Sequence, residues 1–183
     1  NWAPLASFFA GAIAHQRGDP EAINRMRVAT DEILASNFLI RFPIYLGMLA
    51  EAALEQGATE LARSSIADAL AHAERLEEVW CRPELLRILG RVEQRCGDKD
   101  RAEELFFRAM QTAEEAGAFS FQFRATLELA NCWVEAERIA DAAALLDQVC
   151  RQAPGDTPGK PSRALGGCWS GCEAISNNAQ CFV

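Results

Sequence analysis

Three arginines spaced by four residues are the clearest group in this sequence that could do chemistry. Arg87, Arg91 and Arg95 would form one stripe along an α-helix, because residues four apart are neighbours on its surface. Guanidinium groups pair bidentately with carboxylates and phosphates, so the stripe could bind an acidic peptide or a phosphate. The alternative is a solvated face held by pairs such as Glu84 with Arg87, each contributing about 0.2–0.5 kcal/mol. Both interpretations stay open at this point.

Further polar residues would extend the arginine stripe into a groove. If the chain folds as stacked helical hairpins, the first helix of each hairpin faces a shared concave surface. The candidate partner-binding residues on that surface are Glu51, Glu55, Glu84, Arg87, Arg91, Gln94, Arg95, Arg124, Asn131 and Glu135. Because this lining carries both signs of charge, it favours a protein or peptide partner over a nucleic acid.

The last part of the chain contains two patterns that resemble ligand sites without fitting one. Residues 155–162 superficially resemble a phosphate-binding loop, but one residue is missing between the glycines, and Pro161 stands where a Ser or Thr would ligate magnesium. Three cysteines lie in the same part of the chain: Cys168, Cys172 and Cys181. A structural zinc site needs four ligands, usually with closer pairs, so we predict no metal here.

Neither histidine is predicted to belong to a catalytic triad. His15 and His72 have no carboxylate or nucleophile at a spacing typical of a triad. The other four cysteines are spread through the helical part, and we expect them to pack as small hydrophobic residues with reduced thiols. We therefore predict no catalytic, cofactor-binding or metal-binding residues, and no enzyme activity, in this segment.

The composition excludes further classes of function. The chain has 183 residues, half of them hydrophobic, which is enough for one well-buried domain. A net charge of −8 with only two lysines argues against direct binding of nucleic acid. The most apolar run, 38–54, is interrupted by charged residues and a proline, so we expect no membrane span, which needs roughly 20 apolar residues. Seven cysteines, an odd number, and no signal-peptide pattern predict a cytoplasmic location. Because the first residue is Asn1, we expect the natural protein to continue upstream.

A repeat of 40 residues organises the chain and would position the arginine stripe. At this offset, small and large apolar residues recur at spacings of three and four, as on the buried face of a helix. The first-helix columns are Phe9, Leu49, Leu89 and Leu129, then Ala10, Ala50, Gly90 and Ala130. The second-helix columns are Ala22, Ala62, Ala102 and Ala142, then Met26, Ile66, Phe106 and Leu146, then Ala29, Ala69, Ala109 and Val149. We expect these columns to be buried. The alternative is an ordinary helical bundle whose apolar stripes coincide by chance.

Turns divide each repeat into two helices. Gly18, Gly57 and Gly97 suit left-handed helix C-caps, and Glu137 and Arg138 occupy the same place in the fourth repeat. The predicted helices cover 2–17, 20–35, 43–57, 59–77, 83–96, 99–117, 120–136 and 138–152. The predicted fold is an all-α, right-handed solenoid of four tetratricopeptide-like helical hairpins over 1–152. A Gly/Pro/Cys-containing tail follows over 153–183, which we expect to be irregular or disordered.

Two tryptophans stand out in the helical part. Trp80 precedes Pro83, and we expect it to be a wedge between successive hairpins; the alternative is an exposed partner hot spot. Trp133 lies in a core column of the fourth repeat and is expected to pack there.

The columns resemble the tetratricopeptide pattern, although the period is longer than usual for that family. Three stretches, 41–52, 78–90 and 123–130, look like the C-terminal helical region of large bacterial regulators. Those proteins resemble predicted ATPases fused behind a winged-helix DNA-binding domain or an adenylate/guanylate cyclase domain. The most specific stretch has Trp80 followed by Glu-Leu-Leu-Arg and then Gly90.

This resemblance implies a non-catalytic sensor or scaffold arm of a bacterial ATP-dependent transcriptional regulator. The alternatives are the regulatory arm of an adenylate/guanylate cyclase and a free-standing scaffold. In each case the expected partner is a protein or peptide, including other domains of the same polypeptide, with no direct nucleic acid, no membrane and no cofactor. Self-association through the uncapped end of the solenoid is a further expectation.

Overall fold

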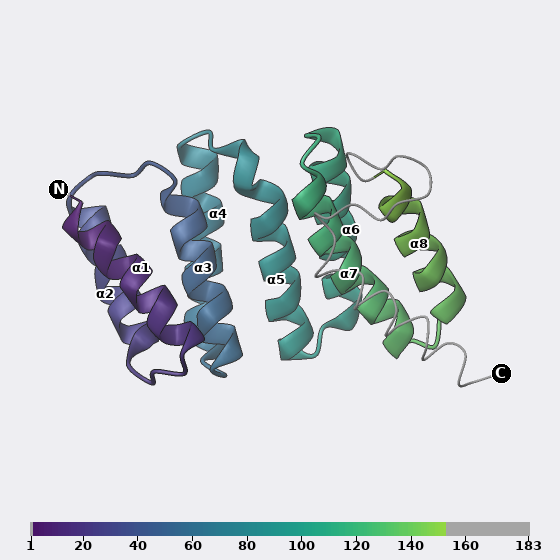
Figure 1. Cartoon of the computed structure of the whole chain (residues 1–183), viewed down its shortest axis with the longest axis horizontal. Helices are drawn as coiled ribbons and strands as arrows, with labels where there is room; N and C mark the ends of the chain where they lie inside the picture. The colour runs from purple at the N-terminus through teal and green to yellow at the C-terminus, as the bar shows by residue number, and fades with distance from the viewer. Residues whose placement is uncertain (1, 153–183) are drawn as a thin grey trace. The chain divides into compact units, whose positions relative to one another are not determined.

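The computed structural model describes residues 2–152, which form eight α-helices and one short 3₁₀ helix and contain no strand (Figure 1). The elements are α1 (Ala3–Gln16), α2 (Ala22–Ala35), α3 (Phe42–Glu55), α4 (Thr59–Arg75), η1 (Val79–Cys81), α5 (Arg82–Cys96), α6 (Lys99–Glu115), α7 (Phe119–Glu135) and α8 (Ile139–Arg151). The predicted all-α class is confirmed, and every helix end lies within two residues of its predicted position. The predicted tail, 153–183, lies outside the described residues.

The turns inside the hairpins follow the expected chemistry with one exception. Gly97 follows α5 with φ of 93°, in the left-handed region that glycine adopts without steric cost. In the fourth repeat Glu137 takes that role with φ of 61°. A side chain in this conformation costs roughly 1 kcal/mol, so this turn is the strained member of the set.

The chain divides into two compact units, with the boundary between Leu105 and Phe106 inside α6. In the first unit α1 packs against α2 and α3 against α4, and α5 contacts both α3 and α4. In the second unit α7 packs against α8. The range expected to be one repeat domain is therefore made of two separately compact parts.

The three second-helix columns are buried in all four repeats, as predicted. The alanine column is Ala22, Ala62, Ala102 and Ala142, and the large apolar column is Met26, Ile66, Phe106 and Leu146. The third column is Ala29, Ala69, Ala109 and Val149. The corresponding faces of α2, α4, α6 and α8 are therefore their core faces.

The first-helix columns are buried or half-buried in the last three repeats, as predicted, but are exposed in the first repeat. Five later members are buried, namely Leu49, Ala50, Gly90, Leu129 and Ala130, and Leu89 is half-buried. Phe9 is 42% exposed and Ala10 is also exposed, so their predicted burial is wrong. In α1 the buried small residue is Gly11, where an added Cβ would lie 2.8 Å from Met26 Cγ and 3.3 Å from the carbonyl oxygen of Ala22. Because α1 approaches α2 closely at this point, the position that must lack a side chain is Gly11 and not the predicted Ala10.

The two linkers between hairpins of the first unit meet at one carboxylate. Glu78 Oε1 accepts a hydrogen bond from the Arg41 backbone N–H at 2.9 Å, and Glu78 Oε2 accepts one from Trp80 Nε1 at 3.2 Å. The Arg41 guanidinium also lies over the Trp80 ring, 5.3 Å from its centroid. Trp80 is 41% exposed, so the predicted wedge is wrong; Cys81, the next residue, takes the buried position. Trp133, by contrast, packs on the Ala130, Ala142 and Leu146 cluster as expected.

Candidate functional site

Helices α3 and α5 bring four predicted groove residues together as a charged cluster of Glu51, Glu84, Arg87 and Arg91. Arg87 Nη2 donates hydrogen bonds to Glu51 Oε1 at 2.6 Å and to Glu84 Oε1 at 2.8 Å. Arg87 Nε donates to Glu84 Oε2 at 3.1 Å, and Arg91 Nη1 donates to Glu51 Oε1 at 2.5 Å. Glu51 therefore joins Arg87 and Arg91 of α5 to α3.

Burial distinguishes the inner pair of the charged cluster from a surface ion pair. The side chains of Arg87 and Glu84 are only 3% and 5% exposed. Burial alone lowers the pKa of Arg87, but the hydrogen bonds and charges of Glu84 and Glu51 outweigh it and raise that pKa above its ordinary value. The intrahelical Glu84–Arg87 pair therefore exists, but in the interior rather than on a solvated face. Neither side chain can meet a partner while this pair is intact, which corrects their expected place on an open groove.

The other predicted groove residues lie in different settings. Gln94 is half-buried and Arg95 is exposed, both near the end of α5. The predicted residues on α7 of the second unit are exposed: Arg124, Asn131 and Glu135. These three belong to a different compact unit from the charged cluster.

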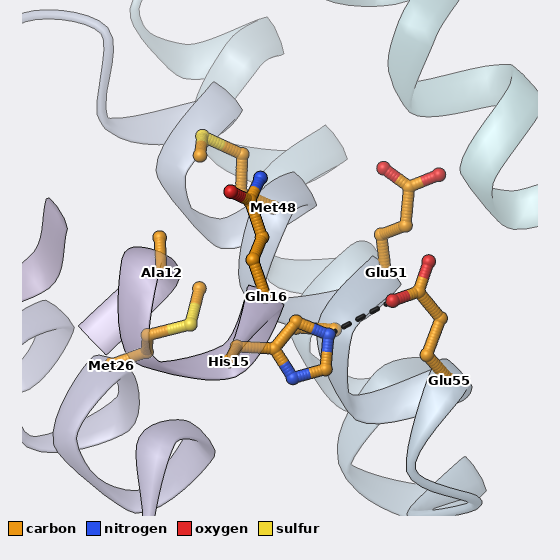
Figure 2. Close-up of a pocket in the computed structure, with 8 residues that line it drawn as sticks. Ala12, His15, Gln16, Met26, Met48, Glu51 and Glu55 are labelled. Atoms are coloured by element: carbon orange, nitrogen blue, oxygen red, sulfur yellow. Dashed lines mark hydrogen bonds and ion pairs between the residues drawn. The ribbon is translucent and has the colours of Figure 1, made fainter. Parts of the chain in front are cut away.

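A pocket of about 160 Å³ adjoins the charged cluster in the first unit (Figure 2). Its lining comes from α1, α2 and α3 and consists of Ala12, His15, Gln16, Met26, Met48, Glu51, Ala52 and Glu55. Met26 is 1% exposed and forms the deep end, whereas Gln16 and Glu55 are exposed at the mouth. In Figure 2, Ala12 and Met26 lie on one side of the pocket and the two glutamates on the other. The pocket therefore has an apolar side and an acidic side.

His15 ties the first hairpin to the second at the mouth of the pocket. Its Nε2 lies 2.9 Å from Glu55 Oε2, and its Nδ1 lies 3.4 Å from Gln56 Nε2. Local spacing in the sequence does not reveal this partner, which lies 40 residues away. That separation equals the repeat period, as it does for Arg91 and Glu51. Pairing polar residues at the repeat offset would have found both contacts.

The chemistry available at this site is recognition by charge, hydrogen bonding and shape. Over 2–152, no three His, Cys, Asp or Glu side chains are grouped as a metal site would require. The buried thiol nearest to α5 is Cys81, whose pKa is raised to about 11, first by burial and then by the charge of Glu78. A thiol with such a pKa stays protonated at neutral pH and is a poor nucleophile. The phosphate-loop-like run and the cysteines of the tail lie outside the described residues.

Comparisons with known proteins leave the family of this chain open. No protein-family model matches the chain, and no curated protein matches it significantly. Within the described range, every helix lacks the combination of length and apolar character that crossing a membrane requires.

Proposed function

We propose that this chain is a non-catalytic protein-interaction module made of tetratricopeptide-like hairpins stacked as a right-handed solenoid. The observation that carries the proposal is the burial of the same second-helix columns in every repeat. A single repeat cannot bury its apolar face alone, so equivalent buried faces at a fixed period are typical of stacked repeats. The polar contacts that join α1 to α3 and α3 to α5 across 40 residues support the same arrangement.

Stacked hairpins use the surface of their first helices to bind partners. In the first unit this surface carries the pocket of α1 and α3 and the exposed Arg95 of α5. Both signs of charge lie on it, with Glu51 and Glu55 on α3 and Arg91 and Arg95 on α5, which fits an extended peptide or another protein domain. The net charge of −8 disfavours a nucleic acid as a direct partner.

The resemblance of three stretches to bacterial regulators supplies the biological setting of the proposal. In that setting the module is a cytoplasmic sensor or scaffold arm of an ATP-dependent transcriptional regulator. The same stretches fit a cyclase-fused regulator, and a free-standing scaffold is the third candidate. The reading frame upstream of Asn1 separates them. A phosphate loop with a winged helix would support the first, a cyclase's paired metal-binding aspartates the second, and an adjacent start codon the third.

A binding titration tests the interaction role directly. The purified chain is titrated with the separately expressed upstream domains, and calorimetry measures the dissociation constant. Arg95→Gln on a first helix should weaken binding, whereas Arg27→Gln, an exposed arginine of the second helix α2, should leave it unchanged. Equal effects of the two substitutions would place the binding surface elsewhere. ATP hydrolysis or nucleotide cyclisation by the purified chain above background would contradict a non-catalytic module.

A further inference from the structure

We infer that the pocket between α1, α2 and α3 binds a primary ammonium group on an unbranched apolar stem, as the lysine side chain of a partner peptide presents it. The peptide source of this ligand rests on the interaction role proposed above, whereas the chemistry of the ligand rests on the pocket itself. The sequence-based expectation for this region was the opposite, an anion on the arginine stripe. Arg87 and Arg91 are both paired with Glu51, so the group of this region that a ligand can reach is the half-exposed carboxylate of Glu55.

The apolar side of the pocket suits a short hydrocarbon stem. Met26 and Met48 line it together with the methyl groups of Ala12 and Ala52. A cavity of about 150 Å³ is known to hold benzene. The pocket volume of about 160 Å³ therefore suits a lysine side chain, which is of similar size. Methionine side chains adapt their shape readily, so they can follow a flexible stem.

The acidic side of the pocket offers a carboxylate oxygen to a cation. Glu55 Oε2 is in contact with His15, and Glu55 Oε1 forms a long ion pair with Arg91 Nη1 at 4.0 Å, a distance that leaves the oxygen able to accept a hydrogen bond from a ligand. Because the Glu55 side chain is 49% exposed, a ligand can reach this oxygen from solvent. An ammonium group has three donors and forms strong, short hydrogen bonds with carboxylates.

An anion fits the same place poorly. The two arginines near the pocket, Arg87 and Arg91, already share Glu51 Oε1 at 2.6 and 2.5 Å. An incoming carboxylate or phosphate would have to displace Glu51 and would then face Glu55. A cation meets Glu55 without breaking any contact of the charged cluster.

Methionine methyl resonances give a direct test on the full chain. The chain has three methionines, of which Met26 and Met48 line the pocket and Met110 lies in the other unit. The chain is labelled with methyl-¹³C methionine and titrated with n-butylammonium, and then with a short peptide carrying one lysine. Saturable shifts are expected for Met26 and Met48 but not for Met110. The same peptide with its lysine acetylated, which removes the charge, should bind about tenfold more weakly or worse.

A matched pair of variants assigns the charge to Glu55. Glu55→Gln keeps the shape of the side chain and should weaken butylammonium binding about tenfold. Glu32→Gln removes one charge that is also exposed, on α2 and outside the pocket lining, and should leave binding unchanged. Circular dichroism of both variants checks that the helices are intact.

The possible outcomes are distinct. Binding of both probes supports the inference together with the peptide role. Binding of butylammonium alone keeps the ammonium site and overturns its assignment to a peptide lysine. Absence of saturable shifts with butylammonium, or equal butylammonium binding by Glu55→Gln, overturns the site itself. Equal binding of the acetylated peptide overturns the assignment to a peptide lysine.

Discussion

Replacing Arg87 by methionine is the sharpest test of the buried charged cluster. Methionine fills a similar length without charge, so the substitution removes the guanidinium and leaves little empty space. Glu84, 5% exposed, would lose both of its hydrogen bonds to Arg87. Glu51 would keep its contact with Arg91. The main consequence is therefore a buried carboxylate that has lost the guanidinium of Arg87.

The cost of Arg87→Met follows from the loss of this buried ion pair. Removing one partner of a buried ion pair typically costs about 3–5 kcal/mol, because the remaining charge stays in the interior. The double variant Glu84→Gln/Arg87→Met removes that charge, so it should be more stable than the single variant by about 1–3 kcal/mol. As a control, Arg27→Met breaks an exposed pair with Asp31 and should cost less than about 1 kcal/mol.

Urea denaturation at neutral pH, followed by far-ultraviolet circular dichroism, measures these differences in the free energy of unfolding. The pH adds an independent readout, because removal of a buried guanidinium disfavours the charged form of the carboxylate that faced it. Protonation then favours the folded state, so the deficit of Arg87→Met relative to the wild type should shrink as the solution is acidified. A loss below about 1 kcal/mol, or no recovery in the double variant, would refute the reasoning that Arg87 is held by buried pairing.

Three further predictions concern packing, backbone strain and pH. Gly11→Ala should lower the free energy of unfolding by about 1–2 kcal/mol in urea denaturation, because the new Cβ would lie 3.2 Å from the backbone nitrogen of Met26 and 2.8 Å from its Cγ. An unchanged urea midpoint would contradict this close contact. Glu137→Gly should raise thermal stability by about 0.5–1 kcal/mol, since φ of 61° favours glycine; a lower melting temperature would show that the turn is not strained. Burial, and then the charge of Arg75, lower the pKa of His72 below 6.5. Because the unfolded chain then binds a proton more readily than the folded chain, the free energy of unfolding should fall as the pH drops through about 6.5. His72→Gln should remove this part of the pH dependence of the free energy of unfolding, and an identical pH dependence in the variant would exclude His72 as its source.

The helices and most of their core faces could be predicted from the sequence, since both depend on local spacing. The failure at Ala10 and Gly11 has a physical reason. Both positions flank one apolar stripe, and only the approach of α2 decides which of them must lack a side chain. The left-handed conformation at Gly97 could also be predicted locally, because glycine favours it. The left-handed conformation of Glu137 could not, because it depends on the geometry of the whole turn.

The charged cluster could be predicted only in part. The spacing of Glu84 and Arg87 on one helix predicts their pairing, but the burial of that pair depends on the helices that pack around it and on a further partner for Arg87 from α3. For Arg87 that partner is Glu51, which lies 36 residues earlier in the chain. The pocket was missed for the same reason, since its lining comes from three helices.

The shared carboxylate of Glu78 has a consequence for how this chain tolerates insertions. One side chain holds the backbone of one linker and the indole of the next, so a change of length in either linker would release both. The glycine turns inside the hairpins have open space around them, because an added Cβ at Gly18, Gly57 or Gly97 would meet nothing within 4 Å, but their positive φ requires that the glycines themselves be kept. A fluorescent label or a fused domain is therefore better placed in the hairpin turns than in the linkers, where it would uncouple neighbouring hairpins.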